Sequence, residues 1–231
     1  QLQQPQRVSV QAFAGWQGKK PAITEVGYQA IGRAESRTLM AESGQADIAF
    51  GLDPVSITRL QASPRVSIVS ATLPRAIQIK FNAGHKWLNT PAMRLAISQS
   101  LNRQAIATAL LRDPQMAATQ LFPPSMKAWH QPGLPALAYQ PEQARRSFAA
   151  LGWKPDADGQ LVRNGEKLAL TLRTYPDRPE LPLIATALQE QLRQAGIAVQ
   201  VKVGNSSEIP AGHKDGTLEL ALYARNYALV P

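Results

Sequence analysis

The chain has 231 residues, of which 44% are hydrophobic, and this suffices for one large or two small globular domains. It contains no cysteine, which excludes disulfides, thiol catalysis and cysteine-ligated zinc. No apolar run approaches the roughly 20 residues of a membrane-spanning helix. The formal net charge is +9, but the basic residues are scattered and no aromatic cluster interleaves with them. We therefore expect no nucleic-acid partner.

The hydrophobic pattern predicts alternating strands and helices along the whole chain. In the first part the predicted elements are a strand at 7–13, a strand at 23–31, a helix at 35–43, a strand at 46–52, a helix at 54–62, and strands at 66–71 and 76–82. The second part continues with a helix from 91, a helix at 141–151, a strand at 168–174, a helix at 181–195, and strands at 197–203 and 217–227. Interleaving without an internal repeat predicts α/β architecture with mixed sheets.

Several residues mark the expected ends of these helices. Thr90 is a good N-cap, and Pro91 suits the first helical turn that follows it. Gly44 and Gly196 are typical stop residues after the helices that precede them. The residues 113–140 are rich in proline and too long for an ordinary connection, so we expect an extended segment that packs against the rest.

The sequence offers little that predicts catalysis or metal binding. His85, His130 and His213 lack the spacing of a metal site, so we expect no metal ligated by the protein. No nucleophile elbow, phosphate-binding loop or dinucleotide-binding motif occurs, so we expect no enzyme and no catalytic residues. Asp47 and Asp53 are explained more simply by turn and capping roles than by a paired-carboxylate site.

The last predicted strand delivers three residues suited to ligand binding. Its leucines at 218, 220 and 222 share one face, and Arg225, Asn226 and Tyr227 follow at its carboxyl end. Binding crevices of open α/β sheets form at such ends. Arginine binds carboxylates in bidentate fashion, asparagine both donates and accepts, and tyrosine offers a flat ring with a polar tip. An exposed corner between strand and loop explains the same residues, and both interpretations stay open from the residues alone.

The order of several motifs resembles a known transport family. Residues 81–106 and 139–153 are two separated helix signatures, with L-F-P-P-S-M at 121–126 between them. The stretches 16–23 and 42–48 are similar to the W-x-G-K-P and S-G-x-x-D-I segments of family-5 extracytoplasmic solute-binding proteins, which serve peptide and nickel ABC importers. Arg94-Leu-Ala and Leu101-Asn-Arg103 resemble the helix motifs V-R-x-A and I-D-R, with Asn102 in place of the usual Asp.

The resemblance implies a periplasmic-binding-protein-like two-lobe fold (class II, cluster C), represented here by a partial chain. Residues 1–78 are then part of lobe I and residues 79–231 most of lobe II, with the strand at 76–82 crossing the hinge. Such proteins close over a ligand and deliver it to an inner-membrane ABC permease. We accordingly expect a periplasmic or otherwise extracytoplasmic, membrane-associated monomer without a cofactor.

The resemblance also bears on the ligand. Peptide-binding members of the family carry an Asp shortly after the final strand, where it pairs with the peptide amino group, but residues 227–231 contain no acid. A buried ammonium without a counter-charge is costly. The run Gly18–Ile23 and the Arg-x-aromatic at 225–227 look closer to the nickel and metallophore branch. We therefore expect a small anionic ligand, a metal chelate or opine-like molecule, with Arg225 pairing its carboxylate. A peptide-binding relative, a hydrolase and the ligand-sensing domain of a regulator remain the alternatives.

Overall fold

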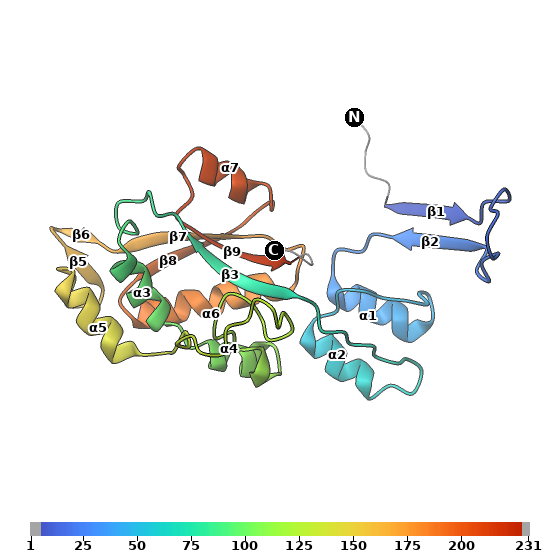
Figure 1. Ribbon diagram of the computed structural model, residues 1–231, viewed down its shortest axis with the longest axis horizontal. Coiled ribbons are helices and arrows are strands. Elements are labelled where there is room, and N and C mark those ends of the chain that lie inside the picture. Colours follow the sequence, from blue (N-terminus) through green and yellow to red (C-terminus); the bar gives the residue numbers. More distant parts are fainter. Residues whose placement is uncertain (1–5, 228–231) are drawn as a thin grey trace. The chain divides into compact units, whose positions relative to one another are not determined.

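The computed structural model describes residues 6–227, and the chain divides into two compact units between Ile68 and Val69. Figure 1 shows the elements of each unit. No helix in the described part of the chain is long and apolar enough to cross a membrane. The predicted lobe boundary at 78/79 stays a prediction; the strand expected to cross the hinge is β3 (Arg75–Phe81) and lies wholly in the second unit.

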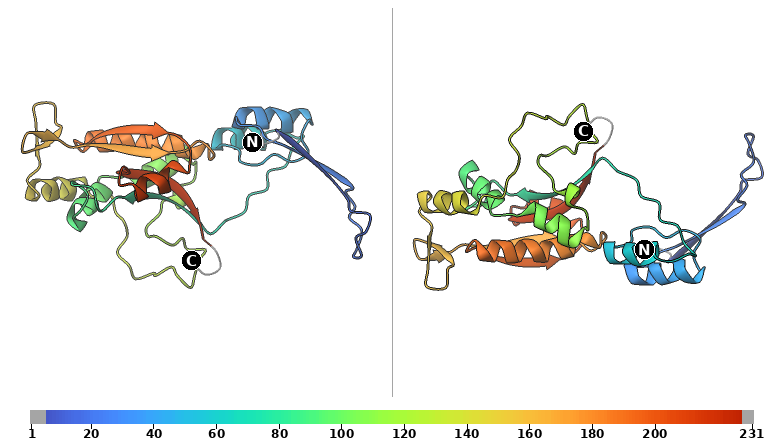
Figure 2. Two further views of the ribbon diagram at one scale, coloured as in Figure 1. Left: turned by 90° about the horizontal axis from the view of Figure 1, so that it is seen from above. Right: turned by 90° about the horizontal axis from the view of Figure 1, so that it is seen from below.

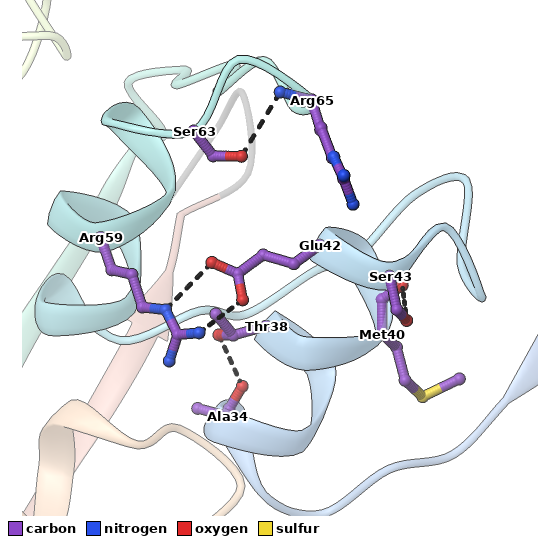
Figure 3. Close-up of polar contacts among 8 residues, drawn as sticks. All are labelled: Ala34, Thr38, Met40, Glu42, Ser43, Arg59, Ser63 and Arg65. Carbon is purple, nitrogen blue, oxygen red and sulfur yellow. Dashed lines mark hydrogen bonds and ion pairs between the residues drawn. The ribbon is translucent and has the colours of Figure 1, made fainter.

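The first unit holds a β-hairpin and two helices. Strands β1 (Arg7–Gln11) and β2 (Glu25–Gln29) pair antiparallel and are exposed along their whole length. Helices α1 (Ala34–Ser43) and α2 (Pro54–Gln61) lie side by side, and Arg59 of α2 forms an ion pair with Glu42 of α1 at 2.6 Å (Figure 3). Most apolar side chains of this unit are exposed, so it buries little core of its own.

The local helix signals in this unit are confirmed. Gly44 ends α1 in the left-handed conformation at φ 74°, as its position after the helix predicts. Asp53 caps α2 by accepting a hydrogen bond from the Ser56 amide at 2.8 Å. This is the capping role that the sequence favoured over a paired-carboxylate site.

The strands predicted at 46–52 and 66–71 are wrong, because both segments are irregular. A strand is stable only when a neighbouring strand takes up its hydrogen bonds. No described strand lies beside either segment, and Ile48 and Phe50 are 72% and 78% exposed. Each segment therefore has a hydrophobic pattern typical of a strand but no described neighbouring strand with which to pair.

The second unit is built on a four-stranded mixed sheet in the order β3-β9-β7-β8. β9 (Leu220–Asn226) pairs antiparallel with β3 and parallel with β7 (Ala169–Thr174), which pairs parallel with β8 (Ala198–Val203). The mixed sheet predicted from the sequence is confirmed.

The two faces of this sheet differ in chemistry. One face carries apolar side chains that pack into the core together with α6 (Glu180–Gln194), and Leu218, Leu220 and Leu222 are at most 1% exposed there. Figure 2 shows α6 running alongside β7 and β8. The register places Gln78, Lys80, Tyr223, Arg225, Thr171, Arg173, Gln200 and Lys202 on the opposite face. The short helix α7 (Glu208–Lys214), which the sequence did not predict, contacts this polar face through Arg173.

The helix predicted from 91 is divided into α3 (Pro91–Gln99) and α4 (Arg103–Leu110). Thr90 caps α3 by accepting from the Met93 amide at 3.3 Å, as predicted. Asn102 caps α4 by accepting from the Ala105 amide at 2.9 Å, so the replacement of Asp by Asn keeps the capping oxygen. Arg103 donates back to the carbonyl of Ser98 at 3.0 Å, near the end of α3. The Leu101-Asn-Arg103 motif thus begins α4 and links it to the end of α3.

The remaining elements complete the second unit. These are the 3-10 helix Pro114–Met116, α5 (Pro141–Ala150), and a three-stranded sheet of β4 (Lys154–Pro155), β5 (Leu161–Arg163) and β6 (Glu166–Lys167). The segment predicted to be extended, 113–140, contains the 3-10 helix, and its residues 117–140 form no helix or strand. Asp156 accepts from the amides of Asp158 and Gln160 in the turn between β4 and β5.

Candidate ligand-binding site

The structure separates the three residues predicted to bind ligand. Arg225 and Tyr227 follow Tyr223 at two-residue intervals and lie on the polar face of the sheet. Asn226 lies on the opposite face, where its Oδ1 accepts from Nε of Arg75 at 2.6 Å. The β3–β9 end of the polar face therefore brings together Arg225 and two tyrosines, while Asn226 is engaged elsewhere.

Gln78 of β3 joins the two tyrosines into one network. It is the register partner of Tyr223, whose hydroxyl donates to Gln78 Oε1 at 3.0 Å. Gln78 Nε2 donates to the Tyr227 hydroxyl, and that hydroxyl donates to the carbonyl of Leu121 at 3.0 Å. The main chain of Tyr227 is also held, because its amide donates to the carbonyl of Pro74 at 2.8 Å.

The proline-rich segment packs onto this end of the sheet through aromatic rings. Phe122 contacts Tyr227 with ring centroids 5.1 Å apart, and it contacts Trp129 at 5.9 Å. His130 Nδ1 lies 2.9 Å from the Phe122 carbonyl, which closes the segment on itself. Tyr227 is 7% exposed as a result, so its ring is a packing residue as well as a member of the site.

The electrostatics differ between the two predicted residues on this face. Burial raises the pKa of the Tyr227 hydroxyl by desolvation, which outweighs the lowering by the Gln78 hydrogen bond and by the nearby positive charge of Arg225. Arg225 itself is exposed, and among residues 6–227 it forms no ion pair and no side-chain hydrogen bond. A guanidinium in this state is free to pair with a carboxylate.

The histidines lie on separate elements. His85 packs edge-on against Trp87, His130 belongs to the proline-rich segment, and His213 lies in α7. Within the described part of the chain, no group of three or more His, Asp or Glu side chains could hold a metal ion.

Sequence reasoning missed Gln78, Tyr223 and the contact with Leu121 and Phe122. Gln78 alternates with apolar residues in β3 and shares its face with Lys80, and this alternation is a signal that could have been read. Nothing in the sequence indicates that β3 pairs with β9, which lies about 140 residues later, so the partners of Gln78 follow only from the tertiary structure.

Solved structures share this fold. The oligopeptide-binding protein AppA from Bacillus subtilis, in complex with a nonapeptide, matches with a TM-score of 0.83 at 21% identity, covering 100% of this chain and 46% of that one. NikZ from Campylobacter jejuni, in complex with Ni(L-His), matches with a TM-score of 0.82 at 18% identity, covering 98% and 44%. The chain thus has the fold of part of a periplasmic solute-binding protein, as predicted.

The family follows from the sequence comparisons. The sequence model of the family "Bacterial extracellular solute-binding proteins, family 5 Middle" matches residues 1–230, and the chain belongs to this family. The nickel-binding periplasmic protein of Escherichia coli K12 is 24% identical over 204 residues, which are 86% of this chain and 39% of that protein. The glutathione-binding protein GsiB of the same organism is 26% identical over 195 residues, 84% and 36%. The chain spans less than half the length of these relatives.

Proposed function

We propose that this chain is part of the substrate-binding component of an ABC importer. The component captures a small anionic ligand outside the cytoplasm, in the periplasm, and hands it to an inner-membrane permease. The ligand is a metal chelate of the nickel–metallophore or opine-like type, so the metal arrives inside the chelate. The component works as a monomer and without a catalytic step. Family membership supports the transport role, and the similarity to a nickel-binding and a glutathione-binding protein supports a small ligand.

One observation carries the choice of an anionic ligand. Arg225 stands exposed beside the two tyrosines on the polar face, and no carboxylate of residues 6–227 neutralises it. Arginine, together with aromatic rings, suits a planar carboxylate on a compact chelate. The absence of an acidic residue from 227–231 supports the same choice, since a peptide ammonium needs a counter-charge.

The second candidate ligand is a peptide. It is favoured by the likeness to AppA, whose structure holds a nonapeptide. A peptide ligand would take its ammonium partner from another part of the protein. A hydrolase or the sensing domain of a regulator would use the same fold for another purpose, and a DNA-binding segment in the complete protein would identify a regulator.

The deciding experiment uses the complete protein. Mass spectrometry of small molecules released after native purification should find a metal chelate with free carboxylates. Calorimetric titration then compares nickel(II)–L-histidine with a tetrapeptide of neutral side chains. Tight binding of the peptide alone would reverse the choice of ligand.

A variant tests the role of Arg225 in this proposal. Truncating one partner of a desolvated charge pair costs about 2–5 kcal/mol, so Arg225→Ala should weaken chelate binding by roughly thirtyfold or more. Arg146→Ala is the matched control, because Arg146 lies on α5 and, among the described residues, its side chain forms hydrogen bonds only with Gln143. Equal affinities in the two variants would remove Arg225 from the site, and a collapsed melting temperature in Arg225→Ala would assign it a structural role.

A further inference from the structure

The direction of the hydrogen bonds around Gln78 is determined by the carbonyl of Leu121. A tyrosine hydroxyl has one proton, and a backbone carbonyl can only accept. The Tyr227 proton therefore goes to Leu121, 3.0 Å away, and toward Gln78 the Tyr227 oxygen can only accept. The amide nitrogen of Gln78 must face Tyr227, which leaves its oxygen facing Tyr223. Only this orientation of the amide satisfies all three contacts.

We propose that Gln78 is the positioning residue of the ligand site, orienting both tyrosine hydroxyls and holding the segment 117–131 against the β3–β9 end through Tyr227. The inference rests on the proposed function in that it takes this end of the sheet as the ligand site. Gln78 is half-buried and lies between the two tyrosines on the same face as Arg225. A neutral amide serves here because it donates on one side and accepts on the other, which neither a carboxylate nor an ammonium does.

The network also defines what the site offers a ligand. Both hydroxyl protons are donated within the protein, that of Tyr223 to Gln78 and that of Tyr227 to the carbonyl of Leu121. Half-buried Tyr223 therefore presents its ring and its oxygen lone pairs, while Arg225 presents only donors. The ligand that fits carries a carboxylate for Arg225 and an N–H or O–H donor for Tyr223, as an amino-carboxylate chelate does.

The first test needs no ligand. Lys127 is exposed, and no other lysine or arginine lies between Arg112 and Arg145, so trypsin cleavage after Lys127 reports opening of the segment. In the complete protein, Gln78→Met keeps the length of the side chain but removes its hydrogen bonds. Cleavage should accelerate roughly fivefold to tenfold, because it follows the population of the open form.

Three further variants complete this test. Tyr227→Phe keeps the ring on Phe122 but loses the bond to Leu121, so it should match Gln78→Met. Tyr223→Phe removes a hydroxyl that does not touch the segment, and Gln200→Met makes the same change as Gln78→Met on the far strand β8. Both variants should be cleaved at a rate within about twofold of the wild type, since neither change removes a bond of the tether, the hydrogen bonds from Gln78 to Tyr227 and from Tyr227 to Leu121. Equal rates for Gln78→Met and Gln200→Met would overturn the tether.

A second test separates positioning from simple packing. In Gln78→Glu the carboxylate accepts from both tyrosines and draws the Tyr227 proton away from Leu121, whereas the protonated acid donates and accepts like the amide. Hydrogen exchange of residues 117–131 should therefore be fast near pH 8 and recover toward the wild-type value near pH 4, a range that spans the ordinary glutamate pKa of about 4.3. Lys80 and Arg225 share this face and His130 lies within the segment, so each measurement is referred to the wild type at the same pH.

The outcomes are distinct. Fast exchange of the Glu variant at both pH values would show that Gln78 only fills space and would overturn the positioning role. Calorimetry with nickel(II)–L-histidine should show at least fivefold weaker binding for Gln78→Met, roughly the cost of one lost neutral hydrogen bond. Unchanged chelate binding together with accelerated cleavage would show that Gln78 holds the segment but has no role in the ligand site. If the wild type binds no chelate, the proposed function fails, while the two ligand-free tests still decide the role of Gln78.

Discussion

Replacing Arg103 with alanine should destabilise the second unit by about 2–3 kcal/mol, because its guanidinium ties the end of α3 to the start of α4. It donates to the Ser98 carbonyl at 3.0 Å, to Ser98 Oγ at 2.7 Å and to the Leu101 carbonyl at 3.3 Å. Hydrogen bonds from charged groups contribute about 1.5–3 kcal/mol each. The sum is reduced here because the side chain is only partly buried, and because desolvation, which lowers the pKa of Arg103, offsets part of the gain.

The assay is native-state hydrogen exchange in the complete protein, which reports the free energy of opening for individual amides. Amides of α3, α4 and β9 should lose protection together in Arg103→Ala. Arg103→Lys should recover only part of the loss, since an ammonium cannot reproduce the planar fork. Arg146→Ala, an exposed arginine on α5, should stay within about 0.5 kcal/mol of the wild type. A loss below this value in Arg103→Ala would refute the argument, because the three contacts would then be exchanged for water at no cost.

Three other predictions follow from single residues. Thr90→Ala removes the N-cap of α3 and should cost about 1 kcal/mol in the same exchange measurement, with Thr90→Ser restoring most of it. Gly196→Ala should destabilise the protein clearly more than Gly159→Ala. Both glycines have φ near 80°, which costs roughly 1–2 kcal/mol for alanine. A Cβ at Gly196 would also lie 2.7 Å from the Gly159 carbonyl oxygen, whereas a Cβ at Gly159 meets nothing within 4 Å. Because the pKa of Tyr227 is raised in the native state, the hydroxyl contributes its full stability below the unfolded-state pKa of about 10 and loses it as the pH rises through the native pKa. Tyr227→Phe should therefore flatten the fall of the melting temperature between about pH 9 and pH 11. Parallel melting curves for the variant and the wild type would contradict this.

The sequence by itself determined the elements that depend on near neighbours. Thr90 and Pro91 predicted the start of α3, and Gly44 and Gly196 predicted helix ends that the structure confirms with φ of 74° and 82°. These signals work because a cap or a left-handed glycine acts within one turn of the chain. The apolar side of β9 was readable for a similar reason, since alternation along a strand is local.

Only the tertiary structure decided which strands form and which residues meet. The segment 46–52 has an alternating pattern like that of β3, but it has no described neighbour to pair with and is irregular, whereas β3 pairs with β9. The same pairing places Gln78 between Tyr223 and Tyr227 and sends Asn226 to the other face. Hydrogen bonds between strands join residues that are distant in sequence, and their register decides the face of every side chain. A trio predicted from adjacency in sequence is therefore divided by the alternation of the strand, and the members of the network come together only when the sheet forms.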